Sequence, residues 1–171
     1  ERLFRYVVVD RLPRDMANRA LLVPASTEEV DYEPDALDEL YRLTDGYPYF
    51  VQAYGKVTWD VAVESPIRVS DVAEAGPEAE GELAVGFFGA RYDRATPAER
   101  DYMRAMAELG ADTNDLAVTT AEVAATLGRK PQSLSPARDG LIKKGLVYSS
   151  ERGTVAFTVP HFGKFLRAQR P

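Results

Sequence analysis

Length, composition and charge already exclude several classes of protein. The chain has 171 residues, 45% hydrophobic and 28% charged, which is typical of one or two folded domains and too apolar for a disordered chain. No apolar run approaches the roughly 20 residues that span a bilayer, and the first residues do not resemble a signal peptide, so we expect a cytoplasmic protein without a membrane partner. The sequence contains no cysteine and one histidine, His161, which argues against a disulfide framework or a zinc site.

The net charge of −6 is distributed unevenly along the chain. Residues 130–171 contain eight lysines and arginines against two carboxylates, a net of +6, so the first 129 residues carry −12. An acidic body with a basic C-terminal region suits a protein that binds nucleic acid at one end. A solvated basic face without a partner is the alternative interpretation.

Residues 1–94 predict one strand followed by a small helical bundle. The strand is expected at residues 3–9, which are apolar and β-branched like a strand buried on both faces. Because no neighbouring strand is predicted nearby, we expect it to be the end of a sheet that belongs to a larger protein. Four helices are then predicted, at residues 13–23, 34–43, 48–63 and 77–94. A short turn is expected near residues 70–75, before the last of them.

Residues 95–171 predict a winged helix-turn-helix domain, and the fold class is therefore mainly α. The first helix begins at Thr96-Pro97-Ala98-Glu99, a capping box with proline at the first helical position. The second is expected to be capped by Thr120 and to end at Gly128, which makes the tight turn of a helix-turn-helix.

The third helix of this domain is expected between Pro131 and Lys144, and Pro136 leaves two forms open. Either Ser135 caps a short helix, or the first turn of a longer helix is kinked, because proline removes a backbone donor. Two alternating runs within residues 146–159 then predict a β-hairpin wing, and residues 162–170 a final helix.

The predicted third helix and wing supply the candidate DNA-binding residues. In a DNA-binding winged helix the third helix enters the major groove and the wing lies along the phosphate backbone. Arg138 is the strongest candidate, whereas Lys143 and Lys144 are explained equally well by the negative end of the helix dipole. The full set comprises Lys130, Gln132, Ser133, Ser135, Arg138, Lys143 and Lys144 on the helix and Arg152 at the wing tip.

No catalytic residue is expected in this sequence. His161 has no serine or carboxylate nearby at catalytic spacing. The acidic runs at residues 28–29 and 78–80 open or flank predicted helices, where carboxylates stabilise the positive end of the helix dipole.

The segment Asp45-Gly46-Tyr47-Pro48-Tyr49-Phe50-Val51-Gln52 resembles the lid of AAA+-like ATPases, especially the archaeal-ATPase and STAND groups. In that family the last core strand leads into a helical lid and then a winged helix, which is the order predicted here. Gly46-Tyr47-Pro48 matches the family's Gly-x-Pro motif, whose proline lies near the adenine of bound nucleotide. The resemblance implies that a full-length parent binds ATP or ADP with magnesium.

The sequence also departs from that family. It contains neither a phosphate-binding Gly-x-x-x-x-Gly-Lys-Ser/Thr loop nor a hydrophobic run ending in paired acids, so we expect this chain alone not to be an enzyme. Many AAA+ lids place an arginine near the start of the helix that begins here at Pro48, yet its first basic residue is Lys56. The alternative interpretation of Gly46 and Pro48 is a helix stop followed by a helix start.

Three functional hypotheses follow from the sequence. The leading one is a winged helix that binds double-stranded DNA under the control of an ATPase core outside this sequence. The second is a protein-interaction or autoinhibitory module, and the third is a free-standing transcriptional regulator. A homo-oligomer is compatible with each of them.

Overall fold

The structure is a computed structural model that describes residues 11–112, 116–149, 151 and 153–169. The predicted strand at residues 3–9 lies outside this part of the chain. The chain divides into two compact units, residues 1–83 and 84–171, each described separately below. The border that the sequence predicts, between residues 94 and 95, stays a prediction. Within the described residues no helix has the length and apolar character needed to cross a membrane.

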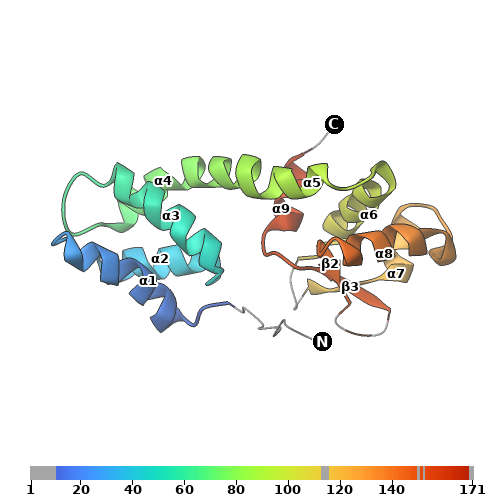
Figure 1. The fold of residues 1–171 in the computed structure, drawn as a ribbon, viewed down its shortest axis with the longest axis horizontal. Coiled ribbons are helices and arrows are strands. Elements are labelled where there is room, and N and C mark those ends of the chain that lie inside the picture. Colours follow the sequence, from blue (N-terminus) through green and yellow to red (C-terminus); the bar gives the residue numbers. More distant parts are fainter. Residues whose placement is uncertain (1–10, 113–115, 150, 152, 170–171) are drawn as a thin grey trace, which may run out of the picture. The chain divides into compact units, whose positions relative to one another are not determined.

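The first unit is a bundle of helices packed around α3 (Figure 1). Its helices are α1 (Arg14–Thr27), α2 (Pro34–Thr44), α3 (Pro48–Val61) and α4 (Val69–Glu82). Proline occupies the first turn of both α2 and α3, where its missing N–H costs nothing because that donor has no partner within a helix. The core is apolar, and Phe50, Val57 and Val72 are almost completely buried.

Two helices of this unit extend beyond their predicted ends. The sequence places the end of the first helix before Pro24, but α1 continues through it to Thr27. It also places the start of the fourth helix at Pro77, whereas α4 begins at Val69 and contains Pro77 in its interior. Burial of Val72, Ala75 and Ala79 along one face of α4 offsets the hydrogen bond that Pro77 removes.

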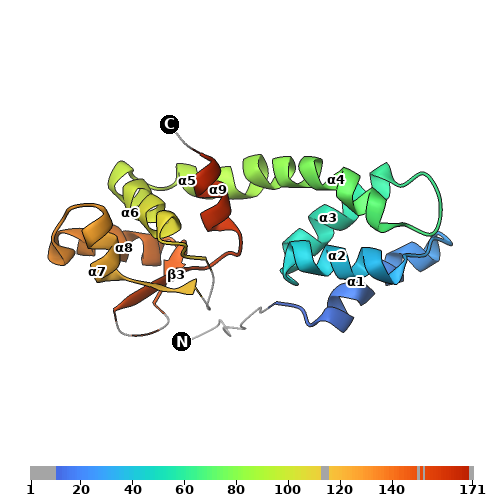
Figure 2. The ribbon, with the colours of Figure 1, turned by 180° about the vertical axis from the view of Figure 1, so that it is seen from behind.

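A π-helical segment, η1 (Leu83–Gly89), follows α4 and leads into the short helix α5 (Ala90–Asp93). The second unit begins within this segment, at residue 84. Its main helices are α6 (Pro97–Glu108), α7 (Thr120–Thr126), α8 (Ser135–Lys143) and α9 (Phe162–Ala168). Helix α6 packs against the other three (Figure 2). A stack of aromatic rings forms part of the core, in which Phe88 lies parallel to both Phe162 and Phe165 at centroid distances of 5.7 and 5.2 Å.

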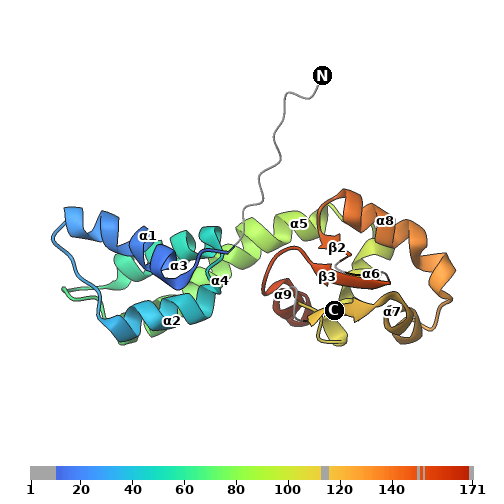
Figure 3. The same ribbon diagram turned by 90° about the horizontal axis from the view of Figure 1, so that it is seen from below.

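A small antiparallel sheet completes this unit (Figure 3). The predicted hairpin is present as β2 (Val147–Tyr148) and β3 (Thr154–Phe157), with Val147 opposite Phe157. The sequence missed a third strand, β1 (Val118–Thr119), which pairs with the other edge of β3 so that the order is β1-β3-β2. The fold is mainly α and winged-helix-like, as the sequence predicted. It consists of helices α6, α7 and α8, the hairpin and the last helix α9.

Candidate nucleic-acid interface

The helix-turn-helix portion is built by local sequence signals. Thr119 caps α7, because its hydroxyl accepts a hydrogen bond from the N–H of Glu122 at 3.1 Å and the Glu122 carboxylate accepts one from the N–H of Thr119 at 2.8 Å. The predicted cap was Thr120, one residue later. Gly128 then adopts a positive φ of 62°, which a residue without a side chain tolerates, and the chain turns into the third helix.

The third helix agrees with neither form that Pro136 left open, because Leu134 and not Ser135 is the N-cap of its α-helical part. Its first turn is a 3-10 helix, η3 (Pro131–Leu134), and the α-helix α8 begins only at Ser135. Pro136 therefore lies in the first turn of α8, where its ring and missing donor are tolerated. Leu134 and Leu141 are buried, and they fix which side of the helix faces solvent.

Most of the candidate DNA-binding residues lie on the exposed side of this helix. Lys130, Gln132, Ser133, Ser135 and Lys143 are all exposed. The hydroxyl of Ser133 donates to the carbonyl of Lys130 at 2.7 Å, which holds the first turn in place. The side chains of Lys130, Gln132 and Ser135 are exposed around this turn.

Arg138, the strongest sequence candidate, is mostly covered. Its side chain is 25% exposed, it pairs with Asp139 at 3.5 Å, and its Nε is buried without a hydrogen-bond partner. It also lies near Tyr102, where burial raises the pKa of the phenol and the positive charge of Arg138 opposes that rise. The Nε of its guanidinium is therefore enclosed within the unit, whereas Nη1 lies beside the exposed Asp139.

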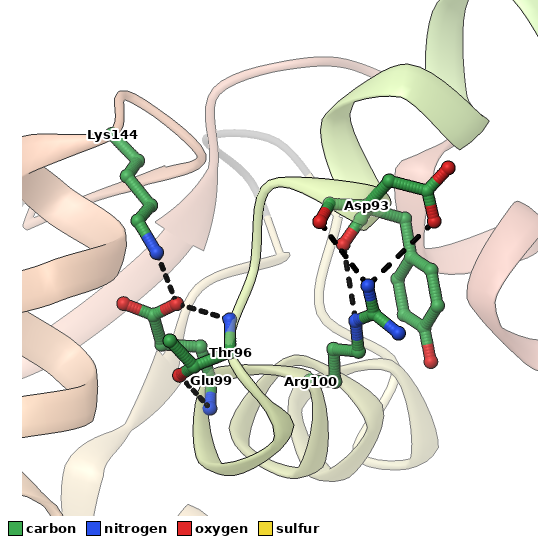
Figure 4. Close-up of polar contacts among 6 residues, drawn as sticks. Asp93, Thr96, Glu99, Arg100 and Lys144 are labelled. Carbon is green, nitrogen blue, oxygen red and sulfur yellow. Dashed lines mark hydrogen bonds and ion pairs between the residues drawn. The ribbon is translucent and has the colours of Figure 1, made fainter.

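Lys144 is held within the fold by Glu99 (Figure 4). Its ammonium lies 2.5 Å from Oε2 of Glu99, whose side chain is only 6% exposed. The same carboxylate accepts a hydrogen bond from the N–H of Thr96 at 2.6 Å, in the predicted capping box of α6. Burial alone would raise the pKa of Glu99, but the hydrogen bonds from Lys144 and Thr96 outweigh it and hold the pKa below its ordinary value.

Arg100 joins α5 to α6 on another side of α6 (Figure 4). Its guanidinium donates to the carbonyls of Tyr92 and Asp93, each at 3.2 Å, and lies over the ring of Tyr92 at 4.5 Å. These contacts make Arg100 a structural cation.

The structure adds Arg129 to the exposed cations at the third helix. It lies between Gly128 and Lys130 and is exposed, and its position immediately after the glycine of the turn could have identified it from the sequence. Arg129, Lys130 and Lys143 form no ion pair with any residue that the structure describes. The exposed face of α8 also carries a carboxylate, Asp139, whose side chain is 60% exposed.

The wing turn is fixed by short side-chain contacts. The hydroxyl of Ser149 lies within hydrogen-bond distance of the carbonyls of Glu151 and Thr154, at 2.8 and 3.0 Å, and the Thr154 hydroxyl lies at 3.0 Å from the carbonyl of Glu151. Gly153 has a φ of 88°, a left-handed conformation suited to glycine. The candidate Arg152 lies outside the described residues.

The turn that contains Gly46, Tyr47 and Pro48 lies in the first unit, between α2 and α3. Gly46 is buried with a φ of 66°, and a Cβ there would overlap the carbonyl oxygen of Leu12. The N–H of Leu12 donates to the Gly46 carbonyl at 2.8 Å, so the glycine is required for this close approach. Tyr47 and Pro48 are half-buried, and the Tyr47 ring packs on Phe50 with centroids 4.8 Å apart.

His161 occupies a left-handed conformation, with φ 62°, immediately before α9. It is the N-cap residue of that helix. Among the described residues, no group of three histidine, aspartate or glutamate side chains is arranged to hold a metal ion.

Comparisons with known proteins agree with this architecture. Residues 85–166 match the model of a domain of unknown function, DUF8462, and no curated protein matches the chain. The Walker-type ATPase PaBY2304 of Pyrococcus abyssi has a similar structure, with a TM-score of 0.69 and 17% sequence identity over 92% of this chain. The alignment covers 42% of the ATPase chain. This chain therefore has the fold of part of that ATPase and spans less than half its length.

Proposed function

We propose that this chain is the lid and winged-helix part of a nucleotide-dependent ATPase, and that its second unit binds double-stranded DNA. The similarity to a Walker-type ATPase supports the first half of the proposal. The observation that carries the second half is the set of exposed cations at the third helix, Arg129, Lys130 and Lys143, which no described carboxylate neutralises. Exposed cations along one helix are suited to phosphate contacts.

Within this proposal the candidate residues take different roles. Arg129 and Lys130 contact phosphates at the start of the helix, and Lys143 contacts phosphate at its end. The exposed side chains of Gln132, Ser133 and Ser135 lie between them and reach base edges. Lys144 is engaged by the buried Glu99 and Arg138 pairs with Asp139, so neither residue is assigned a DNA contact. Arg152 adds a phosphate contact from the wing.

The first unit contributes the nucleotide-dependent part of the proposed function. Pro48 would contact the adenine of ATP or ADP, which an ATPase core outside this sequence would bind with magnesium. The turn is suited to this because the close packing of Gly46 against Leu12 fixes the position of the following proline. The nucleotide state of the core then controls access of the second unit to DNA.

DNA binding is tested by fluorescence anisotropy with a labelled duplex at low salt. We expect the triple substitution Arg129→Ala, Lys130→Ala and Lys143→Ala to weaken binding by about a hundredfold and to reduce the slope of log K against log salt by roughly one per lost cation. Arg94→Ala, an exposed cation of the same unit outside the third helix, is the matched control and should leave affinity within about twofold. Unchanged binding by the triple variant would overturn the DNA assignment.

A docking role for the same helix is favoured by one observation. Asp139 is exposed on the face of α8 that would enter a groove, where a carboxylate is repelled by phosphate but can pair with a cation of a protein partner. Asp139→Asn discriminates between the two functions. This substitution should raise the affinity for duplex DNA if the helix contacts phosphates. The affinity should not change if the helix instead docks on a protein.

A further inference from the structure

A cleft of about 300 Å³ lies between α1 and α3, entirely within the first unit. Its floor is apolar and includes Leu21 and Ala25, and Gly55 leaves space for the Leu21 side chain, which a Cβ at that position would overlap. Trp59 forms part of the wall and is 37% exposed. An exposed tryptophan beside an apolar floor is typical of a binding surface.

The two walls of the cleft have helical spacing. Ala20, Pro24 and Thr27 line it from α1, and Gln52, Lys56 and Trp59 line it from α3. Both sets follow the i, i+4, i+7 pattern of one helix face. A cleft between two helix faces can accommodate the apolar side chains of a third helix, which recur at the same spacing.

Charge defines the kind of helix that fits. Lys56 supplies the only cation among the residues that line the cleft, and its ammonium is already paired with Glu82 at 3.1 Å and with Asp60 at 4.0 Å. Glu28 lines the cleft and is exposed. Residues 11–83 contain sixteen carboxylates and six cations in sequence, a net of −10. At the cleft, Glu28 and the two carboxylates that pair with Lys56 outnumber this single cation, so the rim is negative, which repels an acidic helix and attracts a basic one.

We propose that this cleft binds a basic amphipathic helix of a partner protein. The helix places its apolar side chains on the floor beside Trp59, and its lysines or arginines lie against Glu28 and the carboxylates that surround Lys56. The site is separate from the proposed DNA-binding surface, because every residue that lines the cleft belongs to the first unit. Binding is therefore expected without DNA or nucleotide.

The test uses the full chain and the fluorescence of Trp59, its single tryptophan. The probes are tryptophan-free amphipathic peptides of about 18 residues, long enough to form a helix, with leucines on one face and either lysines or glutamates on the other. We expect the lysine peptide to shift the Trp59 emission to shorter wavelength in a saturable manner. The glutamate peptide, which has the same apolar face, should not do so.

Variants on two helices separate cleft binding from general attraction to an acidic surface. Gln52→Lys, in the cleft, should weaken the lysine peptide about threefold to fivefold, the size of one or two exposed charge contacts, and Gln52→Glu should not weaken it. Ala73→Lys adds the same charge on an exposed position of α4 and is the matched control. No emission shift, equal binding of the two peptides, or equal weakening by Ala73→Lys and Gln52→Lys would each overturn the proposal.

Discussion

At the residue scale, Glu99 connects the start of α6 to the end of α8. Its carboxylate accepts hydrogen bonds from the N–H of Thr96 and the ammonium of Lys144. Glu99→Gln removes the charge and keeps the shape of the side chain, so we expect the free energy of unfolding at neutral pH to fall by about 1–2 kcal/mol. Urea unfolding followed by circular dichroism measures the change. Glu108→Gln, an exposed carboxylate at the end of the same helix, should change it by less than about 0.5 kcal/mol.

The lowered pKa of Glu99 gives this contribution a definite pH dependence. A carboxyl whose pKa is lower in the folded than in the unfolded state adds stability above the unfolded pKa, and that stability is lost as the pH falls through the folded pKa. The difference in unfolding free energy between the parent chain and Glu99→Gln should therefore narrow as the pH is lowered through the acid range. A difference that stays constant would show that the charge of Glu99 is not its source.

At the element scale, glycine-to-alanine substitutions at two helical positions should change the free energy of unfolding in opposite directions. A Cβ at Gly163 in α9 would overlap the carbonyl oxygen of Ala111, whereas one at Gly81, an exposed position of α4, meets no atom of another part of the fold within 4 Å. Gly81→Ala should raise the free energy of unfolding by about 0.5–1 kcal/mol, because alanine favours the helix. Gly163→Ala should lower it by about 1–3 kcal/mol, because a backbone carbonyl cannot move aside easily. Chemical unfolding of both variants tests the pair, and stabilisation by Gly163→Ala would contradict the packing of α9.

Elements with strong local signals were predictable from the sequence. The capping box at Thr96 and Glu99 and the hairpin turn before Gly153 depend on residues close together in the chain, and both are present. Strand β1 was missed because two residues carry no periodicity, and it exists only by pairing with β3. The start of α4 was missed because Asp71, which accepts a hydrogen bond from the N–H of Arg68 at 2.7 Å, follows an arginine in place of the usual serine or threonine.

The candidate site was predictable in its location but not in its detail. Sequence spacing places the third helix correctly, and the exposed residues at its start follow from that placement. Which cations remain exposed depends on contacts across the fold. Glu99 is 45 residues from Lys144, and no local pattern indicates that it engages this cation. Burial of Arg138 likewise depends on how α8 packs on α6.

At the scale of the whole molecule, two units with separate cores should unfold separately. Phe50 lies in the core of the first unit and Phe162 in that of the second, and each is 1% exposed. Trp59, the single tryptophan, reports on the first unit alone. Phe162→Ala should destabilise the second unit by about 3–5 kcal/mol and split the circular-dichroism transition, while the midpoint of Trp59 fluorescence stays in place. Phe50→Ala, the matched change, should move that fluorescence midpoint to lower denaturant. If Phe162→Ala shifts the circular-dichroism and fluorescence midpoints together, the chain unfolds as one cooperative unit, and the prediction of separate unfolding is wrong.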